Sequence, residues 1–183
     1  MLKLYEETIE SDFDGTIIDI ETIGTFPASI SNDYDSRRYR HAPIIVGHIS
    51  KDSLKIHYVE QIRYISALIK NIPDIFSNLK RPFYAFNSIF ETAVFYNNCD
   101  IMILFDYELN KERTEWKGMA IQELGIDNYD DPFNDRGIRC LNAWFEGEIS
   151  ECVTHNRACL LKERDILLKR GTREPDTLDF HPL

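Results

Sequence analysis

The residues in this sequence that point most directly to chemistry are two acids, Asp19 and Glu21, in the stretch Thr16–Thr22. Because successive side chains of a strand point to opposite faces, the two acids would share one face, with Ile18 and Ile20 on the other. Two carboxylates on one buried face repel each other unless a cation lies between them, and hard oxygen ligands favour Mg²⁺ or Mn²⁺. The stretch therefore predicts a divalent-metal site. The alternative that the sequence leaves open is an edge strand whose acids face water.

A second acidic motif, Asp12-Phe13-Asp14-Gly15-Thr16, overlaps the start of this stretch. It resembles the D-x-D-G-T motif of the haloacid-dehalogenase phosphatases, in which the first aspartate is a nucleophile at the end of a buried apolar strand. Here the preceding segment, Tyr5–Ser11, is too acidic for such a strand, and the apolar strand follows the motif instead. Because Gly15 suits a turn, we interpret the motif as an acidic turn that leads into the strand. A phosphatase is the lesser alternative.

Length and composition indicate an ordinary globular protein, with 43% hydrophobic and 28% charged residues. The 183 residues fit one domain, which we expect to have its core over residues 14–170 and an irregular tail over residues 171–183. No apolar run approaches the about 20 residues that cross a bilayer, and the N-terminus lacks the apolar segment of a signal peptide, so no membrane partner is expected. The cysteines at positions 99, 140, 152 and 159 lack C-x-x-C spacing. We therefore expect reduced thiols and a cytoplasmic protein.

The formal net charge of −10 is opposite in sign to that of a general nucleic-acid binder. It leaves room for an enzyme that holds nucleic acid through metal ions and a local basic strip. Positive residues gather in one loop (Arg37, Arg38 and Arg40) and near the C-terminus (Arg157, Lys162, Arg164, Lys169, Arg170 and Arg173). Such clusters are usually solvated surface, so a nucleic-acid role of the C-terminal cluster stays an alternative.

Strands and helices are expected to alternate around the acidic stretch. Strands are expected at Thr16–Thr22, Pro43–Ile49, Leu54–Val59, Arg81–Asn87 and Asp100–Phe105. A helix is expected at Glu60–Asn71, and Pro73 is expected to separate it from a short helix that runs to Asn78. Another helix is expected to follow Ser88, which would be its N-cap. Three more are expected at Trp116–Leu124, Arg136–Glu146 and Ile149–Lys169. The first three strands predict an antiparallel meander. The whole pattern predicts an α/β fold with a mixed five-stranded sheet flanked by helices.

Three segments, in order, resemble the motifs of the DEDD (DnaQ-like) 3′–5′ exonuclease superfamily. Asp19-Ile20-Glu21-Thr22 resembles its first motif, D-x-E-T, and Tyr84–Glu91 resembles its second, A-(H/F/Y)-N-x-x-F-D. Thr154–Cys159 resembles its third, H/Y-N-x-x-D, and the preceding segment Gly137–Glu148 is similar to the YprB-like branch of predicted exonucleases. The resemblance covers about residues 16–169, and it implies a ribonuclease H-like fold.

This resemblance implies two divalent ions, Mg²⁺ or Mn²⁺, that align water and the leaving oxygen for phosphodiester cleavage at DNA or RNA 3′ ends. Asp19 and Glu21 match the first two carboxylate ligands, and Glu91 stands where the family usually has aspartate. His155 matches the residue that orients or deprotonates the attacking water, a task that suits an imidazole with a near-neutral pKa. The resemblance also implies that four residues contact nucleic acid: Thr22, Asn87, Asn156 and Arg157.

The largest departure from the family pattern is Cys159, which lies one helical turn after His155 where the fourth carboxylate is expected. A thiol is a poor ligand for Mg²⁺. Glu163 lies one turn further along the same helix face, with Asp165 nearby, so Glu163 is the candidate fourth ligand. The hypotheses are therefore an active exonuclease and a catalytically impaired module of the same fold that binds nucleic acid or a partner, with the phosphatase third.

Overall fold

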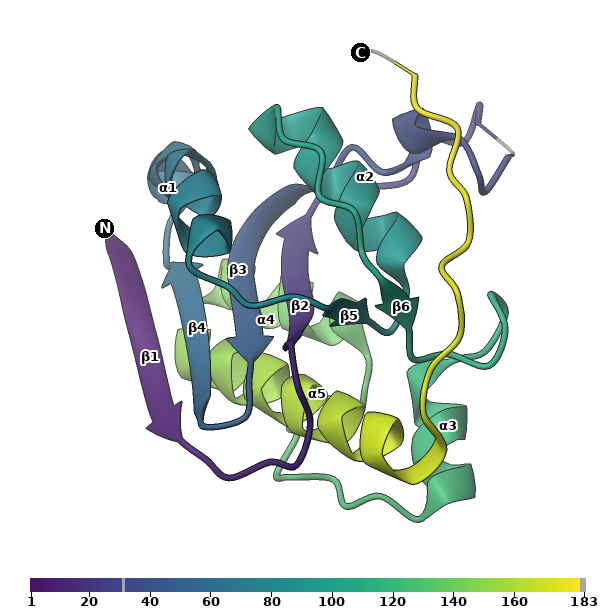
Figure 1. The fold of residues 1–183 in the computed structure, drawn as a ribbon. Helices are drawn as coiled ribbons and strands as arrows, with labels where there is room; N and C mark the ends of the chain where they lie inside the picture. The colour runs from purple at the N-terminus through teal and green to yellow at the C-terminus, as the bar shows by residue number, and fades with distance from the viewer. Residues whose placement is uncertain (31, 182–183) are drawn as a thin grey trace.

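The strand that carries the two acids, β2 (Thr16–Ile23), lies inside a mixed sheet (Figure 1). In the computed structural model, which describes residues 1–30 and 32–181, this sheet has six strands in the order β1-β4-β3-β2-β5-β6. The other strands are β1 (Leu2–Thr8), β3 (Ala42–Ile49), β4 (Ser53–Val59), β5 (Phe83–Ala85) and β6 (Tyr107–Glu108). The pairs β1–β4, β4–β3 and β3–β2 are antiparallel. The pairs β2–β5 and β5–β6 are parallel. The predicted meander of β2, β3 and β4 is confirmed.

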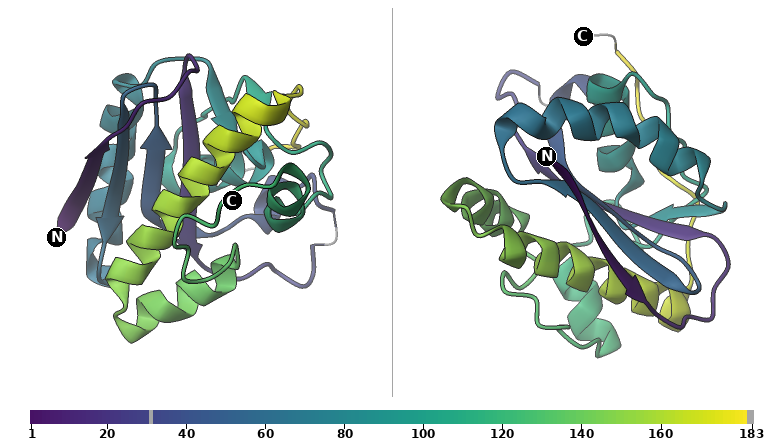
Figure 2. Two further views of the ribbon diagram at one scale, coloured as in Figure 1. Left: turned by 90° about the horizontal axis from the view of Figure 1, so that it is seen from below. Right: turned by 90° about the vertical axis from the view of Figure 1, so that its left-hand side faces the viewer.

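Helices cover both faces of this sheet (Figure 2). Within the described residues, the α-helices are α1 (Ile65–Ser77), α2 (Ser88–Cys99), α3 (Lys117–Leu124), α4 (Gly137–Glu146) and α5 (Ile149–Arg170), and short 3-10 turns lie at Ser36–Arg38 and Ile62–Tyr64. One face is covered by α1 and α2, and the other by α4 and α5, with α3 packed against α5 (Figures 1 and 2). The predicted α/β class, a mixed sheet flanked by helices, is confirmed.

The alternation of side chains along β2 sets the position of the acids. Ile18 and Ile20 are buried in the core. Asp19 and Glu21 point to the opposite face, where they contact residues of α5. The prediction that the two acids share one strand face is confirmed, and the edge-strand alternative is wrong because β3 and β5 pair with the two sides of β2.

The prediction of five strands is wrong because the sheet gains β1 at its edge, beside β4. From Leu4 to Thr8 exposed and half-buried side chains alternate, so Glu6 faces solvent while Glu7 is half-buried and pairs with Arg157. Acidic composition argues against a buried strand, but it suits an edge strand with one solvated face, where charges also discourage pairing with other chains. The expected start of the core at residue 14 is therefore too late.

The predicted break at Pro73 is also wrong, because α1 runs through this residue without interruption. A proline inside a helix removes one backbone hydrogen bond. The apolar face continues on both sides of it, with Leu68, Ile72 and Ile75 all buried, and this packing keeps the helix continuous.

Two predictions next to β5 need correction. Ser88 is the first residue of α2 rather than its N-cap, a position that Asn87 takes, and the Ser88 hydroxyl donates to Glu108 Oε1 at 2.5 Å. The predicted strand Asp100–Phe105 is irregular, and the parallel pairing with β5 begins only at β6. Burial alternates there as in a strand, but the backbone leaves α2 through a left-handed residue, Asp100 (φ 51°), before it reaches the sheet.

The tail is irregular over residues 171–181, as predicted, and it touches the fold through single bridges at Arg173 and Asp179. Ser31, and Pro182 and Leu183 of the predicted tail, lie outside the described residues. The four cysteines are unpaired. Across the described ranges, we find no helix with the length and apolar character needed to cross a membrane.

Candidate metal and nucleic-acid site

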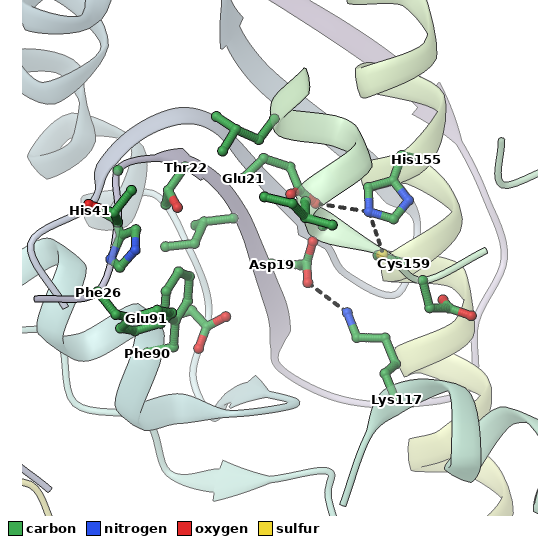
Figure 3. A pocket seen from close by; sticks show the side chains of 17 residues that line it. Asp19, Glu21, Thr22, Phe26, His41, Phe90, Glu91, Lys117, His155 and Cys159 are labelled. Atoms are coloured by element: carbon green, nitrogen blue, oxygen red, sulfur yellow. Dashed lines mark hydrogen bonds and ion pairs between the residues drawn. The ribbon is translucent and has the colours of Figure 1, made fainter. Parts of the chain in front are cut away.

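A pocket of about 530 Å³ opens beside the acids of β2 (Figure 3). Its charged and ligating side chains come from β2, α2, α3, α5, the residue before β3 and the loop before α4: Asp19, Glu21, His41, Glu91, Lys117, Asp135, His155 and Cys159. Its apolar wall includes Phe26, Phe90 and Ile138. The pocket thus joins residues from all three segments that resemble the exonuclease motifs.

Asp19 is held in place by two donors. Its Oδ1 accepts from Lys117 Nζ at 2.8 Å, and its Oδ2 accepts from Asn156 Nδ2 at 2.7 Å. Asn156 enters this space because Gly47 on β3 has no side chain: a Cβ there would lie 2.0 Å from Asn156 Oδ1. Asn156 was expected to contact nucleic acid, but its side chain is fully buried beneath Asp19, so it positions this carboxylate instead.

Lys117 at the start of α3 brings a positive charge into the pocket. Its Nζ lies 2.8 Å from Asp19 Oδ1 and 2.5 Å from Glu163 Oε1. Burial opposes the charge, but Asp19, Cys159 and Glu163 raise the pKa of Lys117 well above its usual range. Sequence analysis missed this residue. One signal was available, because a cation in the first turn of a helix is disfavoured by the helix dipole and so needs another reason to be there.

Glu91 and Glu163 reach the same space from α2 and α5, and both are buried. Neither Glu91 Oε2 nor either carboxylate oxygen of Glu163 has a hydrogen-bond partner among the described residues, so the close approach of Lys117 to Glu163 is an ion pair without hydrogen-bond geometry. Burial, followed by the charges of Asp19 and Glu163, raises the pKa of Glu91 well above its usual range. Asp19 and Glu163 therefore share one ammonium, and Glu91 lies close enough for the charges of these two acids to affect it.

Glu163 rather than Asp165 is the acid that α5 adds to this group. Asp165 accepts hydrogen bonds from the Tyr129 hydroxyl at 2.5 Å and from Arg164 Nε at 2.9 Å, whereas Glu163 Oε1 lies 2.5 Å from Nζ of Lys117, which lines the pocket. The expected candidate for the fourth carboxylate, Glu163, is thus placed beside Asp19.

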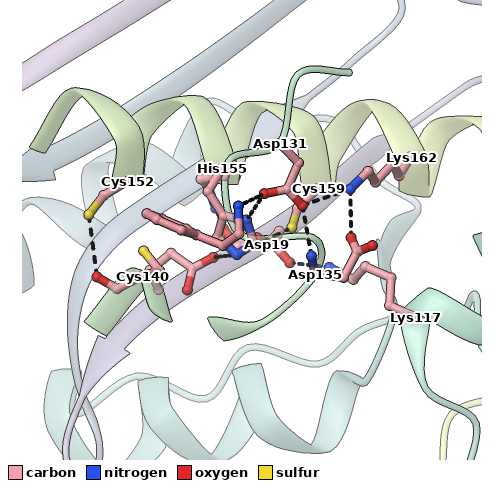
Figure 4. Close-up of polar contacts among 12 residues, drawn as sticks. Asp19, Lys117, Asp131, Asp135, Cys140, Cys152, His155, Cys159 and Lys162 are labelled. Atoms are coloured by element: carbon pink, nitrogen blue, oxygen red, sulfur yellow. Dashed lines mark hydrogen bonds and ion pairs between the residues drawn. The ribbon is translucent and has the colours of Figure 1, made fainter. Parts of the chain in front are cut away.

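His155 lies in a separate buried network on the other side of Asp19 (Figure 4). Its Nδ1 is 2.7 Å from Asp131 Oδ1, and its Nε2 is 3.5 Å from Glu21 Oε1 and 3.8 Å from Cys159 Sγ. Burial opposes a charged imidazole, but Cys159, Glu21 and Asp131 together raise the pKa of His155 to about 12. Burial raises the pKa of Glu21 to about 7 against the opposing charge of His155. The expected near-neutral imidazole does not match this environment.

Asp131 is a further residue that sequence analysis missed. It is buried, and it accepts from Lys162 Nζ at 2.7 Å and from the backbone N–H groups of Phe133 and Asp135 at 2.9 and 2.8 Å. Burial opposes ionisation, but these donors and His155 hold the pKa of Asp131 well below its usual range. Its position in a polar loop gave no pattern that distinguishes it from the other acids nearby. Lys162, expected on a basic surface, is fully buried here.

The other residues expected to contact nucleic acid are divided between the pocket and the distant surface. Thr22 lines the pocket, and Asn87 lies in an adjacent hollow that also includes Trp116. Arg157 is not in the lining: its guanidinium pairs with Glu7 of β1 at 2.5 and 2.8 Å.

The acidic turn before β2 also lies outside the pocket lining. Asp12 and Asp14 are exposed, and Asp14 Oδ1 is 3.2 Å from Lys80 Nζ. Gly15 has φ +95° and lies against Pro82, so the interpretation of this segment as a turn is confirmed. The strand before it, β1, pairs at the sheet edge and not beside β2.

Comparisons of the chain with protein-family models, curated proteins and solved structures gave no match. The chemistry of the pocket is therefore inferred from its own side chains and from the three motifs that resemble the exonucleases.

Proposed function

We propose that this protein is a metal-dependent 3′–5′ exonuclease that hydrolyses phosphodiester bonds of DNA or RNA with Mg²⁺ or Mn²⁺. The observation that carries this proposal is that Asp19 and Glu91 line one pocket, and that the buried Glu163 lies beside it, paired with the same Lys117 ammonium as Asp19. Glu91 Oε2 and the carboxylate oxygens of Glu163 are buried without a hydrogen-bond partner among the described residues, although Glu163 forms an ion pair with Lys117. Buried, unpartnered carboxylates are costly, and a bound cation removes that cost.

The arrangement of strands supports a ribonuclease H-like fold for this proposal. The acids lie on β2, which pairs antiparallel with β3 and parallel with β5. The expected fold likewise begins with an antiparallel meander and adds strands on the other side of the first one. In this interpretation β1 is an addition at the far edge, next to β4.

The donor set fits hard divalent ions. Asp19, Glu21, Glu91 and Glu163 offer carboxylate oxygens, the ligands that Mg²⁺ and Mn²⁺ prefer. When bound, such ions polarise the scissile phosphate and favour in-line attack by water. Lys117 Nζ now lies between Asp19 and Glu163, so this side chain has to withdraw before an ion can bind both carboxylates.

The rim of the pocket supports a nucleic-acid substrate. Phe26 is 50% exposed and Trp116 is 77% exposed, and both lie beside Phe90 in the hollow next to the acids. Exposed aromatic side chains stack on nucleobases without regard to sequence. This type of contact suits an acidic protein, since stacking does not require a basic surface.

A catalytically impaired nucleic-acid-binding module is the second candidate, and Lys117 favours it. An ammonium that already pairs with two of the carboxylates reduces their need for a metal ion. The thiol at Cys159 also favours the module, because it stands where the family pattern has an oxygen ligand and binds Mg²⁺ poorly.

The test combines ion binding with degradation of labelled single strands. Protein freed of metal is titrated with Mn²⁺ by calorimetry, and strands labelled at the 5′ or the 3′ end are then incubated with it. We expect Mn²⁺-dependent release of mononucleotides from the 3′ end, and loss of both ion binding and release in Asp19→Asn. Binding of strands without release in any divalent metal would select the module, and neither binding nor release would refute both candidates.

Asp12→Asn is the matched control for this test, because Asp12 is an exposed acid outside the pocket lining. We expect it to keep nearly full nuclease activity. A covalent aspartyl-phosphate at Asp12, detected by mass spectrometry after incubation with a phosphate ester, would instead support the phosphatase.

A further inference from the structure

A second set of potential metal ligands lies in the same pocket, apart from the carboxylates around Lys117 (Figure 3). Glu21, His155 and Cys159 each offer one ligand atom, and these atoms all lie within 4.8 Å of one another. Glu21 comes from β2, and the other two are one turn apart on α5. We propose that these three residues bind a single transition-metal ion of borderline softness, with Zn²⁺ as the best match.

The two separations that involve the His155 nitrogen fit a tetrahedral ion. Usual Zn–N, Zn–O and Zn–S bond lengths at tetrahedral angles place nitrogen about 3.4 Å from oxygen and about 3.6 Å from sulfur. In this structure His155 Nε2 is 3.5 Å from Glu21 Oε1 and 3.8 Å from Cys159 Sγ. Small adjustments of side chains would therefore complete the coordination.

The orientation of His155 is a second and independent observation. Its Nδ1 lies 2.7 Å from Asp131 Oδ1, which turns Nε2 toward Glu21 and Cys159. Histidine ligands of metals usually bind a carboxylate through the other ring nitrogen in this way, and the contact fixes the ring. Asp131 is itself held by the buried Lys162 at 2.7 Å, so the whole support is rigid.

The chemistry of the three ligands selects the metal. Imidazole and thiolate suit Zn²⁺ and its neighbours in the first transition row, whereas Mg²⁺ and Ca²⁺ require oxygen. Three protein ligands with one further position available are typical of catalytic zinc sites, whereas structural sites use four. All three residues line the pocket, so the fourth position faces it.

This inference deepens the proposed function, because it assigns different metals to the two ions expected in the pocket. The carboxylates around Lys117 suit a hard ion, and the group that includes Cys159 suits a borderline one. The metal site itself can be tested without any nuclease assay, so its failure and the failure of the proposed function are distinguishable.

The test uses Co²⁺ as a spectroscopic probe for Zn²⁺. The full chain, freed of metal and kept without added thiols, is titrated with Co²⁺ under anaerobic conditions. We expect one equivalent to give a near-ultraviolet thiolate-to-cobalt band together with the visible bands of a tetrahedral ion, and Zn²⁺ to abolish both. Folded protein that binds no Co²⁺, or that binds it without the thiolate band, would overturn the proposal.

Cys159→Ser and Cys99→Ser separate this site from other thiols. The first variant should lose the thiolate band, and the second should keep it, because Cys99 lies at the end of α2 and outside the pocket lining. Asp131→Asn should keep the band but weaken Zn²⁺ binding by about 10- to 100-fold, as is usual for loss of a supporting carboxylate. A thiolate band that survives in Cys159→Ser would refute the assignment whatever the other variants show.

Discussion

The substitution Lys117→Met tests whether this ammonium takes the place of a metal ion. Lys117 Nζ lies 2.8 Å from Asp19 Oδ1 and 2.5 Å from Glu163 Oε1, and its side chain is only 17% exposed. Methionine keeps the length and apolar character of the side chain and removes the charge. We expect the variant to be less stable than the wild type without metal, and to bind Mn²⁺ more tightly.

The size of the effect follows from the burial of the partners. Removal of one member of a buried ion pair costs about 3–5 kcal/mol of stability, because the other charge is left unpaired. Here Glu163 can take up a proton, since burial already raises its pKa well above the usual range. This relief favours the lower figure, about 3 kcal/mol. Mn²⁺ at 100 times its dissociation constant would restore about 2.7 kcal/mol, which is nearly the whole loss.

Denaturant unfolding with EDTA and with Mn²⁺ measures both parts of this prediction. Lys111→Met is the matched control, because Lys111 pairs with Glu123 on the surface, where an ion pair contributes little to stability. Two results would contradict the reasoning. One is a Lys117→Met protein as stable in EDTA as the wild type, and the other is a destabilised variant that Mn²⁺ does not restore.

Three further predictions concern the sheet and the pocket. Burial lowers the pKa of His48 to about 3, so the folded protein keeps this imidazole neutral, whereas the unfolded chain protonates it near 6.5. The contribution of His48 to stability should therefore fall by about 1 kcal/mol from about pH 7 to about pH 5.5, and the difference in unfolding free energy between the wild type and His48→Gln should change by this amount. Gly47→Ala should cost about 1–3 kcal/mol in denaturant unfolding, because its Cβ would displace Asn156, whereas Gly118→Ala, with no atom within 4 Å of the added Cβ, should cost nothing. Cys159→Asp should tighten Mn²⁺ binding and weaken Zn²⁺ binding in calorimetry, since it exchanges a soft ligand for a hard one; an unchanged preference would place the bound metal elsewhere.

Local patterns in the sequence were enough to predict the elements around the site. Isoleucines that alternate with acids predicted β2, and the predicted helices Trp116–Leu124 and Ile149–Lys169 agree with α3 and α5 to within one residue at each end. The errors occurred where tertiary packing outweighed local preference. Pro73 does not break α1, because the apolar face of this helix packs on the sheet along its whole length. An acidic segment became β1, because pairing with β4 demands only one apolar face.

The site was harder to predict than the fold, because its charges depend on contacts between distant elements. Asp19 and Lys117 are 98 positions apart, and His155 and Asp131 are separated by a loop and α4. Lys117 and Asp131 lie at no regular spacing from the motif residues, so no sequence pattern could identify them. The same limit applies to Asn156, whose place in the third motif suggested contact with a ligand. Its burial depends on the absence of a side chain at Gly47, on a strand more than 100 residues earlier.

The two departures from the exonuclease pattern, Cys159 and the cation of Lys117, are linked by their position on either side of Asp19. Where the family pattern has a fourth carboxylate, Cys159 Sγ lies 3.8 Å from His155 Nε2 and so belongs to the group that includes Glu21. The carboxylate on the Asp19 side comes instead from Glu163, one turn further along α5. Lys117 forms ion pairs with both Glu163 and Asp19. Cys159, at the position where the exonuclease pattern has aspartate, therefore accompanies a division of the pocket into a carboxylate–ammonium half and an imidazole–thiol half. An assay of the proposed nuclease activity should therefore include Zn²⁺ and Mn²⁺ as well as Mg²⁺, because only one of the two halves offers the ligands that Mg²⁺ prefers.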